Sequence, residues 1–355
     1  MKSSSGKYFV ALDHVRALAA FLVFTWHFTH YKNGYPVPFE FVPDIFVFSI
    51  FNEGHTGVAL FMTLSGYLFA KLLDGKKIDY AHFLWNRFLR LAPLLLLVLF
   101  LVGTKYGLDA DNIKSYLWRV TKGIVYPTLP NGGWSVTAEF HFYLILPFLL
   151  WIARHSKYAL LGVIACMIAF RLFLHSQLGE IQDLSYFTIV GRMDQFLFGI
   201  IAYRFSSLIS GRHIFVGSMA TIFLLFYWWF DSVGGFYHYP TYPSPSLIWI
   251  ILPTIEGLIY GLIIAWYDNS FSHKSGSIST FIAKIGTYSY SIYLLHFFVV
   301  FKMARYIHEN LIDISNYYLA FAFSILCFLL MIPIAYISHR YVETPFLKLR
   351  TPYLK

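Results

Sequence analysis

The sequence contains a succession of long apolar stretches, each close to the length that crosses a lipid bilayer. A membrane-spanning helix needs about 20 mostly apolar residues. Hydrophobic residues make up 58% of the chain and charged residues only 13%, so water cannot cover the apolar surface. The sequence therefore predicts an all-α, polytopic membrane bundle of about ten transmembrane helices. They are expected at approximately 8–30, 45–70, 83–103, 134–153, 158–175, 187–209, 213–230, 247–267, 280–304 and 317–341.

Lysine and arginine residues are distributed unevenly over the connections between these stretches. When the stretches cross the membrane alternately, most of the 27 basic residues fall on the side of the amino terminus. An excess of Lys and Arg marks the cytoplasmic side of a membrane protein. Both termini are therefore expected in the cytoplasm. The formal charge of +9 reflects this topology, and nucleic acid is not an expected partner.

The first apolar stretch is expected to remain as a helix. Lys2 and Lys7 precede it, as basic residues precede a signal peptide, but it is too long and carries Arg16 and His27. Ten spans with short connections account for residues 1–355. We therefore expect a single integral membrane domain, with no appended soluble domain.

Several polar and ionisable residues fall within or at the edge of the apolar stretches. A charged group in the bilayer interior costs about 2.5–3.5 kcal/mol even on lenient insertion scales. Each such residue therefore requires a partner or a function. The candidates are Asp13, Arg16, His27, Glu53, His55, Glu139, His141, Arg192, Asp194, Glu256 and His296.

Arg16 and His27 are the most informative of these candidates. Eleven residues separate them, which is close to three full helical turns, so both side chains lie on one face about 16 Å apart along the axis. Histidine can accept and return a proton near neutral pH, and arginine suits phosphate or carboxylate recognition. In the alternative interpretation Arg16 pairs with Asp13, three residues away, and His27 only hydrogen-bonds within the bundle.

Two carboxylates within the predicted spans are candidate partners for this pair. Glu139 lies near the start of the span predicted at 134–153, shortly after Trp134-Ser135. It either orients a histidine or arginine or forms a structural ion pair. Arg192 and Asp194 lie two residues apart and point to different sides of a helix, so each is expected to have a partner on another helix. His296 is interpreted as a satisfied core histidine rather than a ligand.

Arg87 and Arg90 lie on one helix face at the cytoplasmic start of the third span. With Lys76 and Lys77 nearby, they form a candidate site for a phosphate-rich cosubstrate. In the alternative interpretation they are ordinary positive charges of the cytoplasmic side that contact lipid phosphates.

No metal is expected, because His27 and His30 share a face without further clear ligands. Cys166 and Cys327 lie inside apolar stretches, so no disulfide framework or cysteine-based metal site is expected.

Several short motifs follow one another in the order typical of a known family. Leu12-Asp13-His14-Val15-Arg16 with Trp26-His27 resembles the amino-terminal signature of the acyltransferase-3 family of membrane acyltransferases. Further stretches resemble later segments of that family: Leu64-Ser65-Gly66, Arg87 to Pro93, Trp134-Ser135 with Glu139, Gly191 with Asp194 and Phe196, Tyr288 to His296, and Ser338 with Glu343-Thr344-Pro345-Phe346. The resemblance covers nearly the whole chain. The hydrolase-like carboxyl-terminal domain of some family members has no expected counterpart in it.

The resemblance implies an acetyl-CoA-dependent O-acyltransferase of the bacterial inner membrane. It would move an acetyl group from cytoplasmic acyl-CoA to a carbohydrate or glycolipid beyond the membrane, with O-antigen or another surface polysaccharide as the expected acceptor. His27, Arg16, Glu139 and Asp194 are the candidate catalytic residues, and Arg16, Arg87 and Arg90 the candidate cosubstrate-binding residues. The alternative functions are a proton-coupled transporter or flippase of glycolipids and a structural scaffold.

Overall fold

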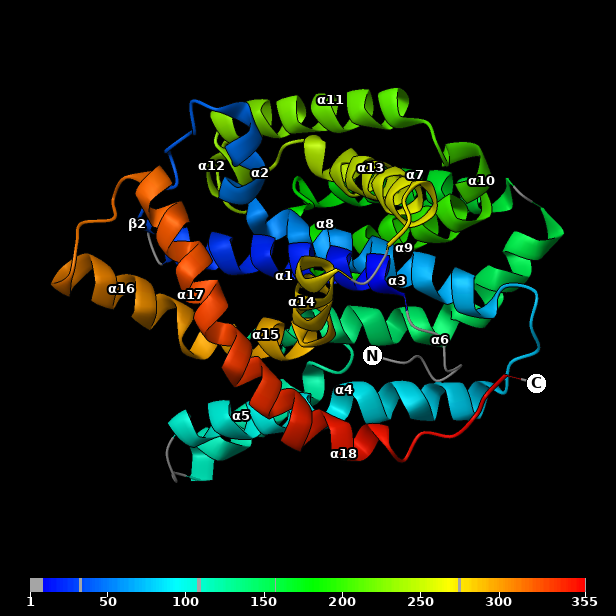
Figure 1. Cartoon of the computed structure of the whole chain (residues 1–355), viewed down its shortest axis with the longest axis horizontal. Coiled ribbons are helices and arrows are strands. Elements are labelled where there is room, and N and C mark those ends of the chain that lie inside the picture. Colours follow the sequence, from blue (N-terminus) through cyan, green and yellow to red (C-terminus); the bar gives the residue numbers. More distant parts are fainter. Residues whose placement is uncertain (1–8, 32–33, 107–109, 157, 274–275, 355) are drawn as a thin grey trace.

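A computed structural model describes residues 9–31, 34–106, 110–156, 158–273 and 276–354 (Figure 1). Nearly all of its regular structure is helical, as predicted. The longer helices are α1 (Val10–Thr29), α3 (Gly57–Leu73), α4 (Tyr80–Gly103), α5 (Ala110–Lys122), α6 (Gly133–His155), α7 (Ala159–Leu178), α9 (Ile189–Arg204), α11 (His213–Ser232), α13 (Ile248–Ser270), α14 (Ser277–Thr287), α16 (Val300–Asn310) and α17 (Tyr317–Ser338).

Short helical elements and one small hairpin connect the longer helices. The short α-helices are α2 (Ser49–Asn52), α8 (Gln182–Phe187), α10 (Ser206–Ile209), α12 (Gly235–His238), α15 (Ser289–Leu295) and α18 (Thr344–Leu347). The turns are η1 (Phe46–Phe48), η2 (Gly54–Thr56), η3 (Thr104–Tyr106), η4 (His296–Phe298) and the π-helical η5 (His339–Glu343). Strands β1 (His30–Tyr31) and β2 (Tyr35–Pro36) pair antiparallel, with His30 opposite Pro36.

Seven helical segments of the described chain are long and apolar enough to cross a membrane. They correspond to seven of the ten predicted spans, so the prediction of a polytopic helical membrane protein is confirmed at that level. The segments are Gly54–Leu73, Tyr80–Gly103, Gly133–His155, Ala159–Leu178, His213–Ser232, Ile248–Ser270 and Tyr317–Leu347.

The three other predicted spans correspond to less regular or more polar helices. Helix α1 is continuous over 20 residues but carries charged residues in its first half, and α9 has only 16 residues. The stretch predicted at 280–304 is divided among α14, α15, η4 and α16. Apolar composition alone did not reveal this interruption, because the stretch stays mostly apolar across the breaks at Tyr288 and at 296–299.

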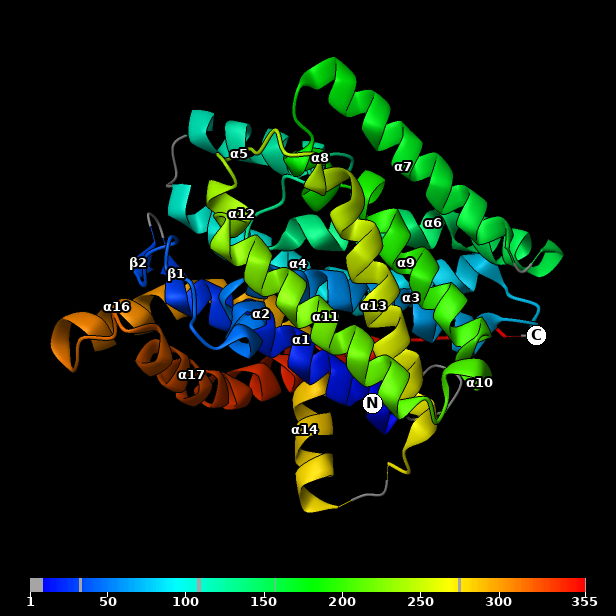
Figure 2. The same cartoon turned by 90° about the horizontal axis from the view of Figure 1, so that it is seen from above.

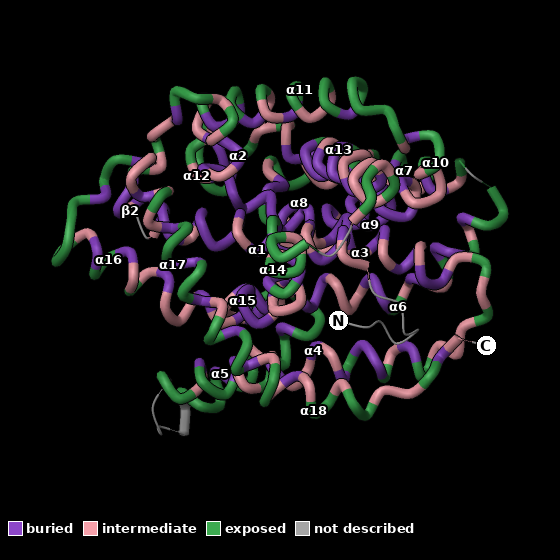
Figure 3. Tube along the Cα trace, in the orientation of Figure 1, coloured by how far each residue is buried: buried purple, intermediate pink, exposed green. Residues whose placement is uncertain are grey.

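Helices α3 and α9 form the centre of the bundle, and α7 and α11 lie at its periphery (Figures 2 and 3). In the most apolar window of the α3 segment 78% of residues are buried, against 17% in α7 and 22% in α11. The peripheral helices expose large apolar side chains such as Phe173 and Ile222. Such surface is stable only against lipid or another apolar partner, so the burial pattern supports a membrane location.

Glycine allows the two central helices to approach until their backbones touch. A Cβ atom at Gly66 of α3 would lie 2.0 Å from the backbone oxygen of Phe196 on α9. A Cβ atom at Gly199 of α9 would lie 2.1 Å from the backbone oxygen of Thr63 on α3. Small residues at such crossings are typical of helix pairs in membranes, where close van der Waals packing replaces the hydrophobic effect.

Substitution of Gly66 by alanine is expected to destabilise the bundle. The added methyl group cannot fit without separating α3 from α9, and overpacking of this kind costs about 1–3 kcal/mol. The midpoint of thermal unfolding in detergent should therefore fall. Gly162→Ala in α7 is the matched control, because no atom lies within 4 Å of the added Cβ position. Equal melting of the two variants would contradict the close-crossing argument.

Candidate active site

The first helix positions the two residues that the sequence placed on one face. Arg16 and His27 both lie on the uninterrupted α1, which packs against α3, α14 and α17. Arg16 forms an ion pair with Asp13, three residues earlier, as the alternative interpretation of the sequence had it. This pairing reduces the cost of placing the guanidinium inside the bundle. It leaves the side chain 22% exposed.

Arg16 reaches a cavity that also contains Arg87, Arg90 and Glu139. The structure thus brings together four candidate residues from α1, α4 and α6. The cavity encloses about 90 Å³. Its remaining lining consists of the hydroxyl-bearing residues Ser65, Ser135, Tyr143, Ser289, Tyr290 and Tyr293, and the apolar residues Val58, Phe61, Met62, Leu64, Leu68, Phe69, Leu91 and Val136.

Arg87 is held in this cavity by aromatic rings. Its side chain is nearly buried, with 7% exposed, and its guanidinium carbon lies 5.2 Å from the ring centre of Phe69 and 5.6 Å from that of Phe83. Cation–π contacts of this kind strengthen when the charge is shielded from water. Its Nε atom is buried and has no hydrogen-bond partner. A donor kept in this condition is available to an anionic ligand.

The carboxylate of Glu139 hydrogen-bonds to residues of the cavity wall and not to His27. Its carboxylate accepts a hydrogen bond from Ser65 at 3.0 Å and another from Tyr143. Ser65 belongs to the Leu64-Ser65-Gly66 motif, so this motif joins α3 to α6 as well as to α9. Glu139 is therefore a polar link between two helices that line the cavity.

His27 lies on α1, towards its carboxyl end, and faces a second histidine. Its Nδ1 atom is 2.8 Å from the backbone oxygen of Val23, and Nε2 of His296 lies 3.3 Å from the same Nδ1. His296 Nδ1 is in turn 3.1 Å from the backbone oxygen of Ile292. Because a carbonyl oxygen can only accept, Nδ1 of each histidine carries the proton. Nε2 of His27 then holds a lone pair and can act as a base.

Asp194 is bound to Arg171, not to Arg16 or His27. Two nitrogens of Arg171 on α7 contact its two carboxylate oxygens, at 2.6 and 3.2 Å, and Thr254 of α13 also donates to it. Both charged side chains are completely buried. In the described part of the chain neither Asp194 nor Glu139 hydrogen-bonds to Arg16 or His27. The hypothesis of direct contact with these residues is therefore corrected, whereas the expected partner of Asp194 on another helix is confirmed.

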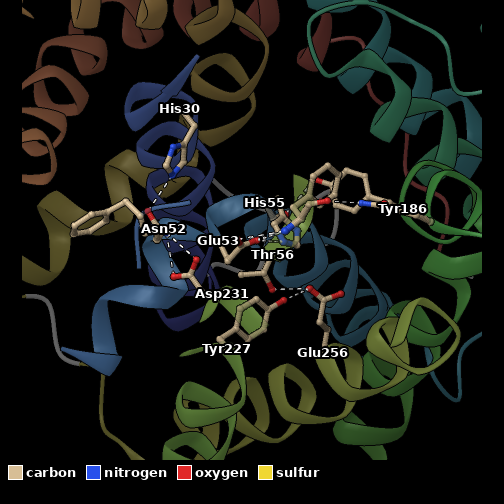
Figure 4. Close-up of polar contacts among 12 residues, drawn as sticks. His30, Asn52, Glu53, His55, Thr56, Tyr186, Tyr227, Asp231 and Glu256 are labelled. Carbon is tan, nitrogen blue, oxygen red and sulfur yellow. Dashed lines mark hydrogen bonds and ion pairs between the residues drawn. The ribbon is translucent and has the colours of Figure 1, made fainter. Parts of the chain in front are cut away.

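Arg192 belongs to a separate buried network. Figure 4 shows part of this network, with Glu256 beside Thr56 and Tyr227. Arg192 donates to Gln195 at 3.1 Å, and Gln195 donates to Glu256 at 2.8 Å. Glu256 also accepts hydrogen bonds from Thr56 and Tyr227, each at 2.7 Å. The buried carboxylate is therefore well satisfied, and it joins η2, α9, α11 and α13.

Asp231 and Glu53 form a second part of this polar region (Figure 4). Asn52 donates to Asp231 at 3.0 Å and lies 2.9 Å from Nε2 of His30. Glu53 lies 2.9 Å from Nε2 of His55. Our sequence analysis did not select Asn52, which is uncharged, or Asp231, which follows the end of an apolar stretch. The only local signal was a lone acidic residue directly after Trp228-Trp229-Phe230.

Comparison with known proteins places this arrangement in a family. A family profile described as an acyltransferase domain matches residues 9–340. The chain belongs to the acyltransferase-3 family. Two similar proteins of Staphylococcus aureus are named "Putative O-acetyltransferase SACOL0978" (strain COL) and "Putative O-acetyltransferase SAS0844" (strain MSSA476).

The match to these acyltransferase-3 relatives is distant but long. Each is 25% identical over an alignment 393 positions long, which covers 96% of this chain and 58% of the relative. The chain therefore spans somewhat more than half the length of the curated relatives that it matches. No solved structure matches the chain.

The closing motif of this acyltransferase-3 chain also has a structural role. Ser291, from the Tyr288–His296 segment, hydrogen-bonds to Ser338 at 3.0 Å and to the carboxylate of Glu343. Motifs that lie about 50 residues apart in sequence thus meet inside the bundle. Some of the motif residues that carry the family resemblance therefore join segments of the bundle to one another, and do not only face a substrate.

The Asp194–Arg171 pair predicts a loss of stability when one partner is removed. Asp194→Ala should lower the free energy of unfolding by about 3–5 kcal/mol, because it leaves a buried, uncompensated guanidinium. The double variant Arg171→Met, Asp194→Leu should recover much of that loss, since an apolar pair needs no counter-charge. Thermal unfolding in detergent checks both. Wild-type stability of Asp194→Ala would contradict the structural assignment.

Proposed function

We propose that this protein transfers an acetyl group from acetyl-CoA to a hydroxyl of an extracytoplasmic carbohydrate. One observation carries the proposal: a single helix, α1, presents Arg16 to an arginine-lined cavity and, about 16 Å farther along, presents His27 with an available Nε2. A donor and an acceptor that approach from opposite ends of the bundle can meet along this face. The acyltransferase-3 family and the relatives named O-acetyltransferases support the same activity.

The donor site follows from charge and size. Arg16, Arg87 and Arg90 give the cavity a positive lining suited to phosphates. Its volume of about 90 Å³ is well below the roughly 300–1,000 Å³ of pockets for drug-sized ligands. The cavity is thus too small for a whole CoA molecule: the phosphates bind at the arginines, and the acyl-bearing arm extends along α1 towards His27. Because acyl-CoA is made in the cytoplasm, we propose that this end of the bundle is cytoplasmic and that both termini lie on that side.

His27 acts as general base in the proposed reaction. Its Nε2 removes the proton of the acceptor hydroxyl as the hydroxyl oxygen attacks the thioester carbonyl. The carbon–sulfur bond then breaks, and the leaving CoA thiolate takes the proton from His27, so that an ester and free CoA result. The contacts of Nδ1 with Val23 and His296 fix the tautomer that this step requires.

The surroundings of His27 suit a sugar acceptor. The ring centres of Phe297 and Trp26 lie 4.5 and 4.7 Å from that of the histidine, and Phe301 is 5.9 Å away. Aromatic faces offer apolar contact to the C–H face of a sugar while its hydroxyls remain free to react. We propose a surface polysaccharide, such as O-antigen, as acceptor and the bacterial inner membrane as the location.

The remaining candidate residues act at a distance from the reacting atoms. Glu139 positions Ser65 in the cavity wall, and Asp194 holds α9 against α7 through Arg171. Arg16 binds the donor within the cavity, with Asp13 fixing the guanidinium. No residue of this scheme requires a metal ion, and acetyl-CoA is the only cosubstrate.

Replacing His27 by alanine should abolish acetylation. Loss of a general base costs about 10²- to 10⁴-fold in rate, and the product is measured as polysaccharide acetyl by mass spectrometry or proton NMR. Cells carrying wild type, His27→Ala or no gene are compared. His155→Ala, which changes an exposed histidine at the end of α6, is the matched control and should acetylate normally.

Acetyl-CoA dependence distinguishes this function from its alternative. Purified wild-type protein should transfer labelled acetyl from acetyl-CoA to the acceptor, whereas a transporter or flippase needs no acyl donor. Normal acetylation by a stably folded His27→Ala protein would exclude His27 as the base. Movement of a glycolipid without acyl-CoA, together with no transfer, would favour the transporter.

A further inference from the structure

The segment after α18 packs against the beginning of α4 and hydrogen-bonds to it (Figure 1). The side chain of Asn86 donates to the backbone oxygen of Thr351 at 2.6 Å and accepts from its backbone nitrogen at 3.1 Å. Farther along, the backbone nitrogen of Asp79 donates to the oxygen of Tyr353 at 2.8 Å. The Tyr353 ring is 98% buried and packs edge-on against Phe83, with ring centres 5.5 Å apart. These contacts fix the position of Arg350 next to the arginines of α4.

Several buried polar atoms at this junction have no hydrogen-bond partner. They are Nε and Nη2 of Arg350, Nε of Arg87, Oγ1 of Thr351 and the hydroxyl of Tyr353. Buried donors are almost always satisfied in folded proteins, so a cluster of this kind requires an explanation. Every one of these groups can donate a hydrogen bond. The missing partner is therefore rich in acceptor oxygens.

The local charge leads to the same kind of ligand. Burial, together with the positive charges of Arg90 and Arg87, lowers the pKa of Arg350 to about 9, so it remains a cation at neutral pH. The acidic group that acts on it, Glu343, is fully buried, and its Oε1 accepts a hydrogen bond from Ser291; its Oε2 lies 3.4 Å from Nδ1 of His339 without a hydrogen bond. The positive charges of Arg90 and Arg87 act unfavourably on Arg350, and a bound anion would offset them.

We propose that Arg350 is the third guanidinium of a phosphate site formed with Arg87 and Arg90, and that it binds the 3′-phosphate of acyl-CoA. This inference rests on the proposed function and deepens it. Arg87 and Arg90 line the cavity that Arg16 of α1 also reaches, from which the acyl-bearing arm extends towards His27, whereas Arg350 does not line it. Arg350 therefore meets the phosphate group farthest from the thioester, and that is the phosphate on the ribose. The diphosphate, which is nearer to the thioester in acyl-CoA, then binds to Arg87 and Arg90.

Binding of CoA and of 3′-dephospho-CoA to the full-length protein in detergent tests this assignment. By titration calorimetry, Arg350→Gln should bind CoA roughly tenfold or more weakly than wild type, as expected for a lost hydrogen bond between charged groups. Its affinity for dephospho-CoA should stay within about twofold of the wild-type value, because the group that Arg350 contacts is absent. Lys348→Gln removes the same charge from an exposed position in the same segment and should leave both affinities unchanged.

Each other outcome overturns the assignment in an identifiable way. Unchanged CoA binding by Arg350→Gln would mean that the junction holds something else, such as a lipid phosphate. If Arg350→Gln lowered the affinities for CoA and for dephospho-CoA equally, the 3′-phosphate would be excluded as the group that Arg350 binds. The ligand-free variant should melt at or above the wild-type temperature, because an unpaired cation has been removed; a lower value would show that Arg350 supports the fold instead. If wild type neither binds CoA nor transfers acetyl, the proposed function fails first.

Discussion

The backbone contact between α3 and α9 fixes the centre of this protein. Gly66 and Gly199 let the two helices approach to a distance that no side chain would permit. From this crossing α3 carries Ser65 into the cavity, and α9 carries Asp194 towards Arg171. In a membrane, such close packing supplies much of the energy that holds helices together. The positions of Ser65 and Asp194 therefore depend on two residues that have no side chain.

Around this centre the buried charges fall into two classes. Asp194 and Glu256 have full sets of hydrogen-bond partners on neighbouring helices, so their cost within the membrane is compensated. Arg87 and Arg350 retain buried donors without partners. A group of the first class stabilises the fold, while a group of the second class is held ready for a ligand. This difference in hydrogen bonding, rather than charge alone, distinguishes Asp194 and Glu256 from Arg87 and Arg350.

The two ends of α1 divide the proposed reaction between them. Arg16 belongs to the arginine-lined cavity, and His27 lies among aromatic rings beside His296. The helix is rigid because its backbone hydrogen bonds are continuous over 20 residues. It can therefore hold a phosphate-binding region and a base at a fixed separation. An enzyme that joins a cytoplasmic donor to an external acceptor needs such a separation within one membrane protein.

The sequence by itself determined the class of this protein, the face shared by Arg16 and His27, and the family resemblance. These features depend on composition, on helical period and on short motifs, all of which are local. Only the tertiary structure showed that Asp194 pairs with Arg171, that His296 contacts His27, that Asp231 joins the buried network, and that Arg350 reaches the arginines of α4. These partners lie from 23 to 269 residues apart in the sequence. No local pattern encodes such contacts, because they arise from how the helices cross.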